Sequence, residues 1–369
     1  MKSFSELRIA SLFSLLLFIT FTVDAQTTSP TPPIQEEDQV VKVESRLVVV
    51  PVSVTNAAGD PVLGLKATDF HVSEENRPQV IDSLGTADNV PLEIAILFDV
   101  SASADSMFKF QQETAAKFLQ EVLRPDDRAT IFTVGEKPVL VQERDTAEKS
   151  QVGIRSITPT KNLTAFYDSV RVAAEHLNQN APKGRRKVIV VISDGEDTNS
   201  AGVIKAIMDA ERKVTANIQG EELRTLRFRA RDTAKANEQV RVLKSLQDAD
   251  TVFYSINPGG SSLQLNKMAQ FGQENLQKFA DDTGGTAYLP KFQPVDTKDE
   301  LANTSNMKKN TATLELIFKQ LANELRAQYL VQYYSDSEFP NNKYVRLSLG
   351  LKNPANYRVR ARQGYYVKN

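Results

Sequence analysis

Four short apolar segments constrain most strongly how this chain can fold. They are Ile94–Phe98, Ala129–Val134, Val188–Ile192 and Val252–Ile256, and none of them alternates apolar with polar residues. Continuous apolar runs of this length are typical of strands that are buried on both faces of a sheet.

The sequence between these runs carries apolar residues at helical spacing. Three stripes repeat at intervals of three and four residues: Ala115, Phe118, Leu119, Val122 and Leu123; Phe166, Val170, Ala173, Ala174 and Leu177; and Leu314, Ile317, Phe318, Leu321 and Leu325. Such stripes predict amphipathic helices. Strands that alternate with helices predict an α/β fold, in which a doubly wound and mostly parallel sheet is covered on both faces.

Both flanks of this region alternate instead. Strand-like patterns fill residues 40–90 and 328–369, for example at Leu47–Val54 and Tyr344–Leu349. Each flank is too short to bury a core of its own. We therefore expect the N-terminal and C-terminal strands to pack together as one small β module beside an α/β domain at 91–327.

The first 25 residues have the composition of a signal peptide. Two basic residues precede the apolar run Ile9–Val23, and small residues before position 26 predict cleavage near Ala25. The alternative is an uncleaved anchor, but the run is short for a spanning helix, and no membrane span is expected in the mature chain. Residues 26–39 are proline-rich and then acidic, which predicts an extended linker. The chain has no cysteine, and we expect a secreted or periplasmic protein without disulfides.

Charge argues against nucleic acid as a partner. The formal net charge is −1, so the chain has no global field that would attract a polyanion. Residues 212–245 differ, because they hold nine basic and four acidic residues, a net +5. We interpret them as a basic helical insertion in the α/β domain. It is either simply solvated or an arm that grips an acidic partner.

Five oxygen-bearing side chains follow the apolar runs. Asp99 ends the first run, and Ser101 and Ser103 alternate in the loop after it. Asp194 follows the third run, and Thr164 opens a helix. Ligands of doubly wound sheets bind beyond the carboxyl ends of the strands, where the winding reverses. If the strands that carry Asp99 and Asp194 are neighbours, all five side chains converge in one crevice.

This donor set suits a hard divalent cation. Mg²⁺ prefers six oxygen ligands and keeps several waters, and Mn²⁺ or Ca²⁺ also accept oxygen donors. The three hydroxyls bring no charge, so the cation stays electrophilic and can accept a carboxylate from a partner. The pattern therefore favours a binding site for a protein or peptide with an acidic side chain.

The same residues resemble a known motif. Asp99-x-Ser101-x-Ser103, the isolated Thr164 and Ser193-Asp194-Gly195 resemble the metal-ion-dependent adhesion site of von Willebrand factor type A domains, over roughly residues 90–327. The resemblance implies a Rossmann-like fold in which the serines and the threonine contact the cation and the aspartates act directly or through water. The flanking strands and export signal resemble a bacterial subfamily of secreted proteins with such domains.

Catalysis is not expected. His71 lies in the predicted β module and His176 on a helix of the α/β domain, so a Ser-His-Asp triad is not predicted. A Mg²⁺-dependent phosphohydrolase of the haloacid-dehalogenase type would need a second aspartate where Ser101 stands, as its general acid. We thus expect a secreted, cation-dependent adhesion or interaction module. The alternative is an envelope scaffold whose cation site only stabilises loops or does not function.

Overall fold

The computed structural model describes residues 46–101, 106–160, 162–214, 220–258, 267–295, 297–354 and 356–368. The predicted signal peptide at 1–25 and linker at 26–39 lie outside these residues. So do residues 40–45 of the predicted β module.

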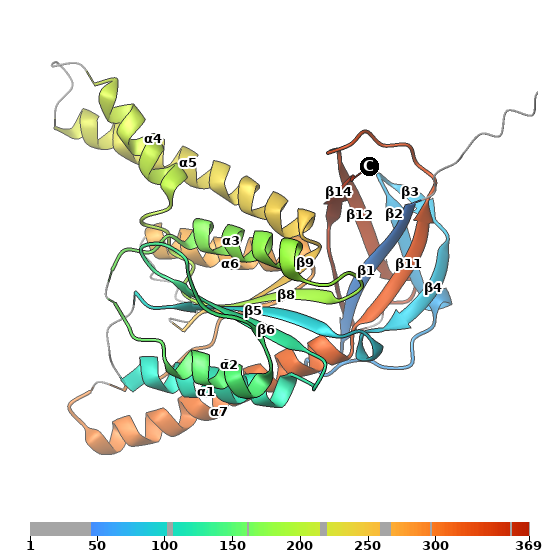
Figure 1. The fold of residues 1–369 in the computed structure, drawn as a ribbon, viewed down its shortest axis with the longest axis horizontal. Helices are drawn as coiled ribbons and strands as arrows, with labels where there is room; N and C mark the ends of the chain where they lie inside the picture. Colours follow the sequence, from blue (N-terminus) through green and yellow to red (C-terminus); the bar gives the residue numbers. More distant parts are fainter. Residues whose placement is uncertain are drawn as a thin grey trace, which may run out of the picture. The chain divides into compact units, whose positions relative to one another are not determined.

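The centre of the α/β domain is a six-stranded sheet in the order β10-β9-β8-β5-β6-β7 (Figure 1). Its strands are β5 (Leu92–Asp99), β6 (Arg128–Val134), β7 (Val139–Asp145), β8 (Arg186–Ile192), β9 (Thr251–Ile256) and β10 (Ala287–Tyr288). All neighbours pair in parallel except β6 and the edge strand β7. The four apolar runs are the four central strands. The predicted doubly wound, mostly parallel sheet is confirmed.

Helices cover both faces of this sheet (Figure 1). One face packs against α1 (Ser106–Val122), α2 (Ala147–Arg155) and α7 (Glu300–Arg326). The other packs against α3 (Phe166–Asn180), α4 (Ala201–Arg212), α5 (Glu221–Asp248) and α6 (Lys267–Thr283). Every residue of the three predicted apolar stripes is buried. None of the described helices is both long and apolar enough to cross a membrane.

The flanking β module consists of two four-stranded sheets, β13-β1-β11-β4 and β14-β12-β2-β3. Its strands are β1 (Arg46–Thr55), β2 (Phe70–Glu74), β3 (Arg77–Gln79), β4 (Ile81–Thr86), β11 (Tyr329–Ser335), β12 (Tyr344–Leu351), β13 (Arg358–Ala361) and β14 (Gly364–Tyr366), with 3-10 turns at Ala67–Asp69 and Ala87–Asn89. N-terminal β1 pairs with C-terminal β11 and β13, and β2 pairs with β12. Side chains from both sheets share one apolar core. The prediction that the two ends of the chain build one β module is confirmed.

The expectation of a solvated insertion at 212–245 is wrong for its second half. In α5 no residue of 221–233 is buried, whereas Ala234, Val242 and Leu246 belong to the core on the α3 face of the sheet. These apolar residues recur at helical spacing and cover the strands, so this half cannot be solvated. Only the first half of α5 extends beyond the core.

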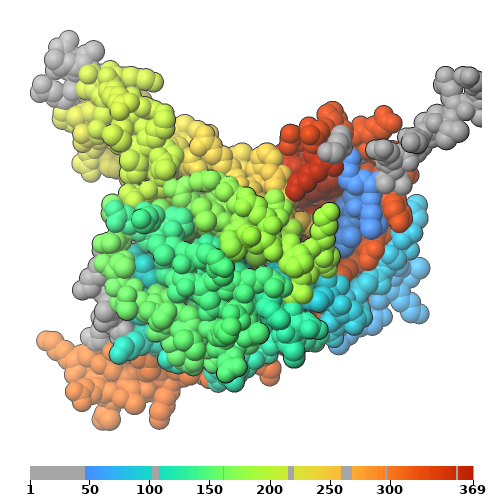
Figure 2. Space-filling model, in the orientation of Figure 1, coloured from blue at the N-terminus to red at the C-terminus, as the bar shows by residue number. Residues whose placement is uncertain are grey.

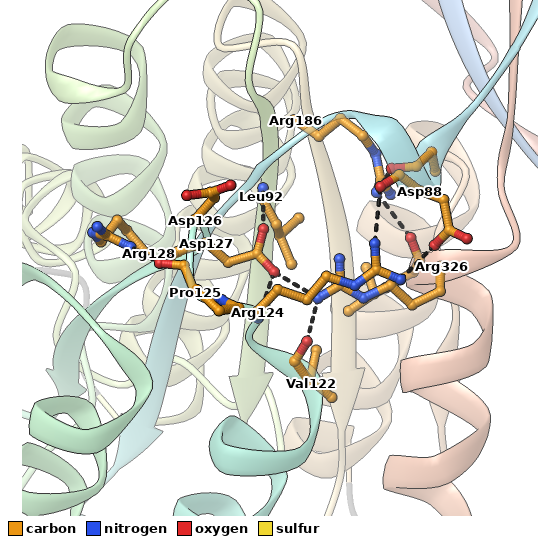
Figure 3. A network of polar contacts seen from close by, with 12 residues as sticks. Asp88, Leu92, Val122, Arg124, Pro125, Asp126, Asp127, Arg128, Arg186 and Arg326 are labelled. Carbon is orange, nitrogen blue, oxygen red and sulfur yellow. Dashed lines mark hydrogen bonds and ion pairs between the residues drawn. The ribbon is translucent and has the colours of Figure 1, made fainter.

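A buried polar network lies at the end of the sheet where β5 and β8 begin (Figure 3). The Asp127 carboxylate is almost fully buried and accepts hydrogen bonds from the Leu92 amide (2.7 Å), the Arg124 amide (2.8 Å) and the Arg326 guanidinium (2.5 Å). Nearby, the buried Arg186 guanidinium donates to the Leu325 carbonyl (2.8 Å). The C-terminal end of α7 is thus anchored where the parallel strands begin. The loops with Asp99 and Asp194 lie where these strands end.

Candidate metal centre

The winding of the sheet reverses at β5. From β5 the chain moves to β6 and β7 on one side, and then returns to β8 and β9 on the other. β5 and β8 are parallel neighbours, with Phe98 beside Ile192 in the register. Asp99 ends β5, and Ser193 and Asp194 follow β8, so their side chains leave neighbouring strands at the switch point. The condition on which the predicted site depended, that these two strands are neighbours, is met.

Asp99 is held from two sides. The Ser193 hydroxyl donates to Asp99 Oδ2 (2.6 Å), and the Ser101 amide donates to Asp99 Oδ1 (2.9 Å). Burial raises the pKa of Asp99 above its usual value. The hydrogen bonds from Ser193 and Ser101 oppose this shift, and the charge of Asp194 adds to it. The charge of Asp194 thus acts on Asp99 from the neighbouring strand, as expected for two carboxylates at one site.

Asp194 and Glu196 share a short turn after β8. The Glu196 amide donates to Asp194 Oδ1 (2.9 Å). Burial raises the pKa of Asp194; burial and then the charges of Asp194 and Asp99 raise the pKa of Glu196. The sequence prediction missed Glu196, although it stands two residues after Asp194 in an acidic run. It brings a third carboxylate to the edge of the site.

Thr164 is fixed through its main chain. Its amide donates to the Thr198 hydroxyl (2.8 Å), and its carbonyl accepts from the amides of Thr198 (2.8 Å) and Asn199 (2.9 Å). These bonds tie the loop before α3 to the loop that follows Asp194. The buried Thr164 hydroxyl makes no hydrogen bond to another described residue, so it is free to contact a ligand. α3 itself begins two residues later, at Phe166.

Four of the five predicted ligands lie in the described residues. Asp99, Ser101 and Asp194 are brought together by the contacts given above, and Thr164 stands on the loop hydrogen-bonded to the Asp194 segment. Ser103 lies outside the described residues, and its place in the site stays a prediction.

A second group of buried residues, which the sequence did not reveal, supports the Asp194 turn from behind. Asn275 of α6 donates to the Gly195 carbonyl (3.0 Å), and its Oδ1 accepts from the Tyr167 hydroxyl (3.1 Å) and Gln239 Nε2 (2.6 Å). Gly195 has φ +76°, and a Cβ added at Gly272 would stand 2.6 Å from the Asp194 carbonyl oxygen. Helix α6 therefore packs against this turn so closely that only glycine fits at the contact, and α3 and α5 support it through Asn275.

The residues present fit a divalent cation. Every candidate donor is an oxygen, which suits Mg²⁺, Mn²⁺ or Ca²⁺. No lysine or arginine among the described residues forms an ion pair with Asp99 or Asp194, so none of these residues neutralises their charge. No cluster of three His, Cys, Asp or Glu residues that could hold a metal occurs in the described ranges. A cation here would therefore need the serine and threonine hydroxyls as well as the carboxylates.

Comparison with known proteins supports this part of the fold. Residues 94–196, from β5 to the turn after Asp194, match the family profile of the von Willebrand factor type A domain. Among curated proteins, a nucleotide-binding protein of Campylobacter curvus (strain 525.92) is 28% identical over 151 residues, which cover 40% of this chain and 89% of that protein.

Solved structures with similar folds include a von Willebrand factor type A protein from Catenulispora acidiphila. It is 13% identical with a TM-score of 0.37, and the match covers 74% of this chain and 51% of that one. Another is proximal thread matrix protein 1 of the mussel byssus with a zinc-occupied metal-ion-dependent adhesion motif. It is 10% identical with a TM-score of 0.37, and the match covers 68% of this chain and 50% of that one.

The α/β sheet, the site at its switch point and the profile match define one class of domain. Residues 94–196 are similar to the von Willebrand factor type A domain, and the β module built from both ends of the chain flanks this region. Domains of this class generally mediate protein interactions.

Proposed function

We propose that this protein is a secreted module that binds an acidic protein or peptide segment through a divalent cation. Asp99, Ser101, Ser103, Thr164 and Asp194 would hold the cation. The observation that carries the proposal is the pair of carboxylates, Asp99 and Asp194, which leave neighbouring strands at the switch point and form no ion pair with a described basic residue.

The protein side chains have distinct roles in this proposal. A divalent cation held by two carboxylates and neutral hydroxyls keeps an affinity for one further anionic oxygen, which a partner carboxylate would supply. The Ser193 hydroxyl and the Ser101 amide orient the two oxygens of Asp99. The main-chain bonds of Thr164 fix its position, so its hydroxyl needs no reorganisation to bind.

In this proposal an acidic partner can bind only when the cation is present, because the site itself is negatively charged. Without the cation, the three carboxylates of Asp99, Asp194 and Glu196 lie at the site, and their negative charge would repel a partner carboxylate. With it, the net charge of the site is less negative. The same acidic partner is therefore excluded from the apo protein and accepted by the loaded one.

Calorimetric titration of Mg²⁺ and Mn²⁺ into the chelated protein tests the metal site. We expect binding by the wild type and none by Asp99→Ala. The matched control Asp336→Ala removes an exposed carboxylate of the β module and should bind like the wild type. With the ion at ten times its Kd, linkage stabilises the fold by ~1.4 kcal/mol, a rise in Tm of a few degrees. Equal heats from wild type and Asp99→Ala would refute the site.

A pull-down with and without chelator tests the binding role. Partners that are lost on chelation and lost with Asp99→Ala support the interaction module. An unchanged set of partners, together with a Mg²⁺-dependent rise in Tm, would instead support the scaffold whose cation only stabilises loops.

The secreted location rests on the N-terminal pattern alone. Mass spectrometry of the mature protein from the periplasm or the medium should find a chain that begins near Gln26. A chain that keeps residues 1–25 and fractionates with the membrane would support the uncleaved anchor.

A further inference from the structure

The first half of α5 packs along α4, and the two helices form an arm whose outer part extends beyond the core on the α3 face of the sheet. We define the arm as residues 201–213 and 220–233. Figures 1 and 2 show it as the yellow-green pair of helices that extends past the layer of α3 and α6. Val203 is the single buried residue of α4, and residues 221–233 contain none. Apart from Val203, which belongs to the core on the α3 face, the arm contributes no buried residue to the core.

Its charge is concentrated on one short segment. Arg224, Arg227, Arg229 and Arg231 fall within eight residues that include no acidic residue. Arg227 forms an ion pair with Glu211 of α4 (2.7 Å), and Arg231 approaches the adjacent Asp232 (3.3 Å). Among the described residues no carboxylate pairs with Arg224 or Arg229. Two guanidinium groups thus form no ion pair within the described part of the chain.

An exposed aromatic ring contacts two of these guanidinium groups. Phe228 is 40% exposed, and the guanidinium carbons of Arg224 and Arg231 lie 5.4 Å and 4.8 Å from its ring centroid. Cation–π contacts of this kind hold guanidinium groups in place before a ligand arrives. Arg229 lines the neighbouring groove of about 630 Å³ between α4 and α5, which Lys205, Lys213 and Arg241 also line.

We propose that the arm is a second interaction surface, which binds an acidic segment of a partner protein through Arg224, Phe228, Arg229 and Arg231. Planar guanidinium groups bind carboxylates in bidentate geometry, and arginine with an aromatic residue is the combination enriched at the energetic centres of protein interfaces. Charge complementarity selects the occupant. The three arginines carry +3, and two of them have no ion pair with a described carboxylate, so an acidic segment complements this surface.

Other anionic ligands fit less well. A nucleic acid would require many phosphate contacts, and the basic cluster spans only two turns of helix on a chain with net charge −1. An anionic membrane would require a broad apolar face, but Phe228 lies between guanidiniums, and Glu221 and Glu222 stand at the start of the same helix.

Fluorescence anisotropy with a labelled glutamate-rich peptide tests this surface on the full mature chain, in EDTA so that the cation site contributes nothing. The variant is Arg224→Gln/Arg229→Gln/Arg231→Gln. The matched control, Lys308→Gln/Lys309→Gln/Lys319→Gln, removes the same charge from exposed positions of α7. We expect the peptide to bind the wild type and the control equally and the arm variant about tenfold more weakly. A glutamine-rich peptide should not bind.

Several results would overturn the proposal. Equal weakening in both variants would show that only net charge matters. Tighter, arm-dependent binding to phosphatidylserine vesicles or single-stranded DNA would assign the arm to a membrane or a nucleic acid. A dimer in sedimentation velocity that the arm variant abolishes would make a second copy the occupant. Circular dichroism should show that both variants keep the wild-type fold, since none of the exchanged side chains belongs to the core.

Discussion

Asn275 gives the sharpest test of how the fold prepares the cation site. Its side chain is almost fully buried and joins the Gly195 carbonyl to Tyr167 and Gln239 through three hydrogen bonds. Asn275→Ala removes all three and leaves their partners unsatisfied. At about 1 kcal/mol for each bond, the free energy of unfolding should fall by about 3 kcal/mol, and Tm by roughly 6–12 °C.

The functional effect should exceed a general loss of stability. Because Gly195 directly follows Asp194, the turn would lose its support, and side chains that orient metal ligands typically contribute 10–100-fold to affinity. We therefore expect calorimetry to show Mg²⁺ binding about 10–100-fold weaker in Asn275→Ala. Urea denaturation of the apo protein gives the stability change independently.

Asn310 provides a matched control. Asn310 lies on α7, far along the chain from the site, and is equally buried. Its side chain makes two hydrogen bonds with the main chain of Gln293. Asn310→Ala should cost about 2 kcal/mol and leave Mg²⁺ affinity unchanged. If Asn275→Ala binds Mg²⁺ as the wild type does, or if both variants lose affinity alike, the proposed support of Asp194 is refuted.

Three further predictions follow from the same structure. Asp127→Ala removes the carboxylate that the partly buried Arg326 guanidinium and two amides donate to, and should cost about 3 kcal/mol in urea denaturation. Burial raises the pKa of Asp127, but the hydrogen bonds from Arg326 and the amides outweigh burial, so the pKa is lowered overall. The ionised carboxylate therefore stabilises the fold above about pH 4, and this stabilisation is lost as the pH falls further. The difference in the free energy of unfolding between wild type and variant should disappear at that low pH. Because burial raises the pKa of Asp99, its ionised form destabilises the apo fold at neutral pH. Apo Asp99→Asn should thus melt higher than apo wild type, with a difference that shrinks as the wild-type carboxyl is protonated on acidification; a lower Tm would contradict this. Finally, purified protein with Mg²⁺ should release no phosphate from p-nitrophenyl phosphate, and turnover that Asp99→Asn abolishes would favour the phosphohydrolase instead.

The sequence by itself determined the elements and the residues they bury. The continuous apolar runs became the central strands, and the stripes at helical spacing became the buried faces of α1, α3 and α7. This was possible because the period of apolar residues is a local property, set by the geometry of a single helix or strand. The motif residues Asp99 and Asp194 were readable for the same reason, since each directly follows such a run.

The tertiary structure alone decided which distant elements meet. The hydrogen bond from Ser193 to Asp99 joins residues 94 positions apart, and Asn275 reaches the Gly195 turn from a helix 80 positions away. The division of α5 into a core half and an exposed arm also depends on where the sheet ends beneath it. Such contacts depend on the order of the strands in the sheet and on which helices pack against each face. A local pattern of side chains determines neither.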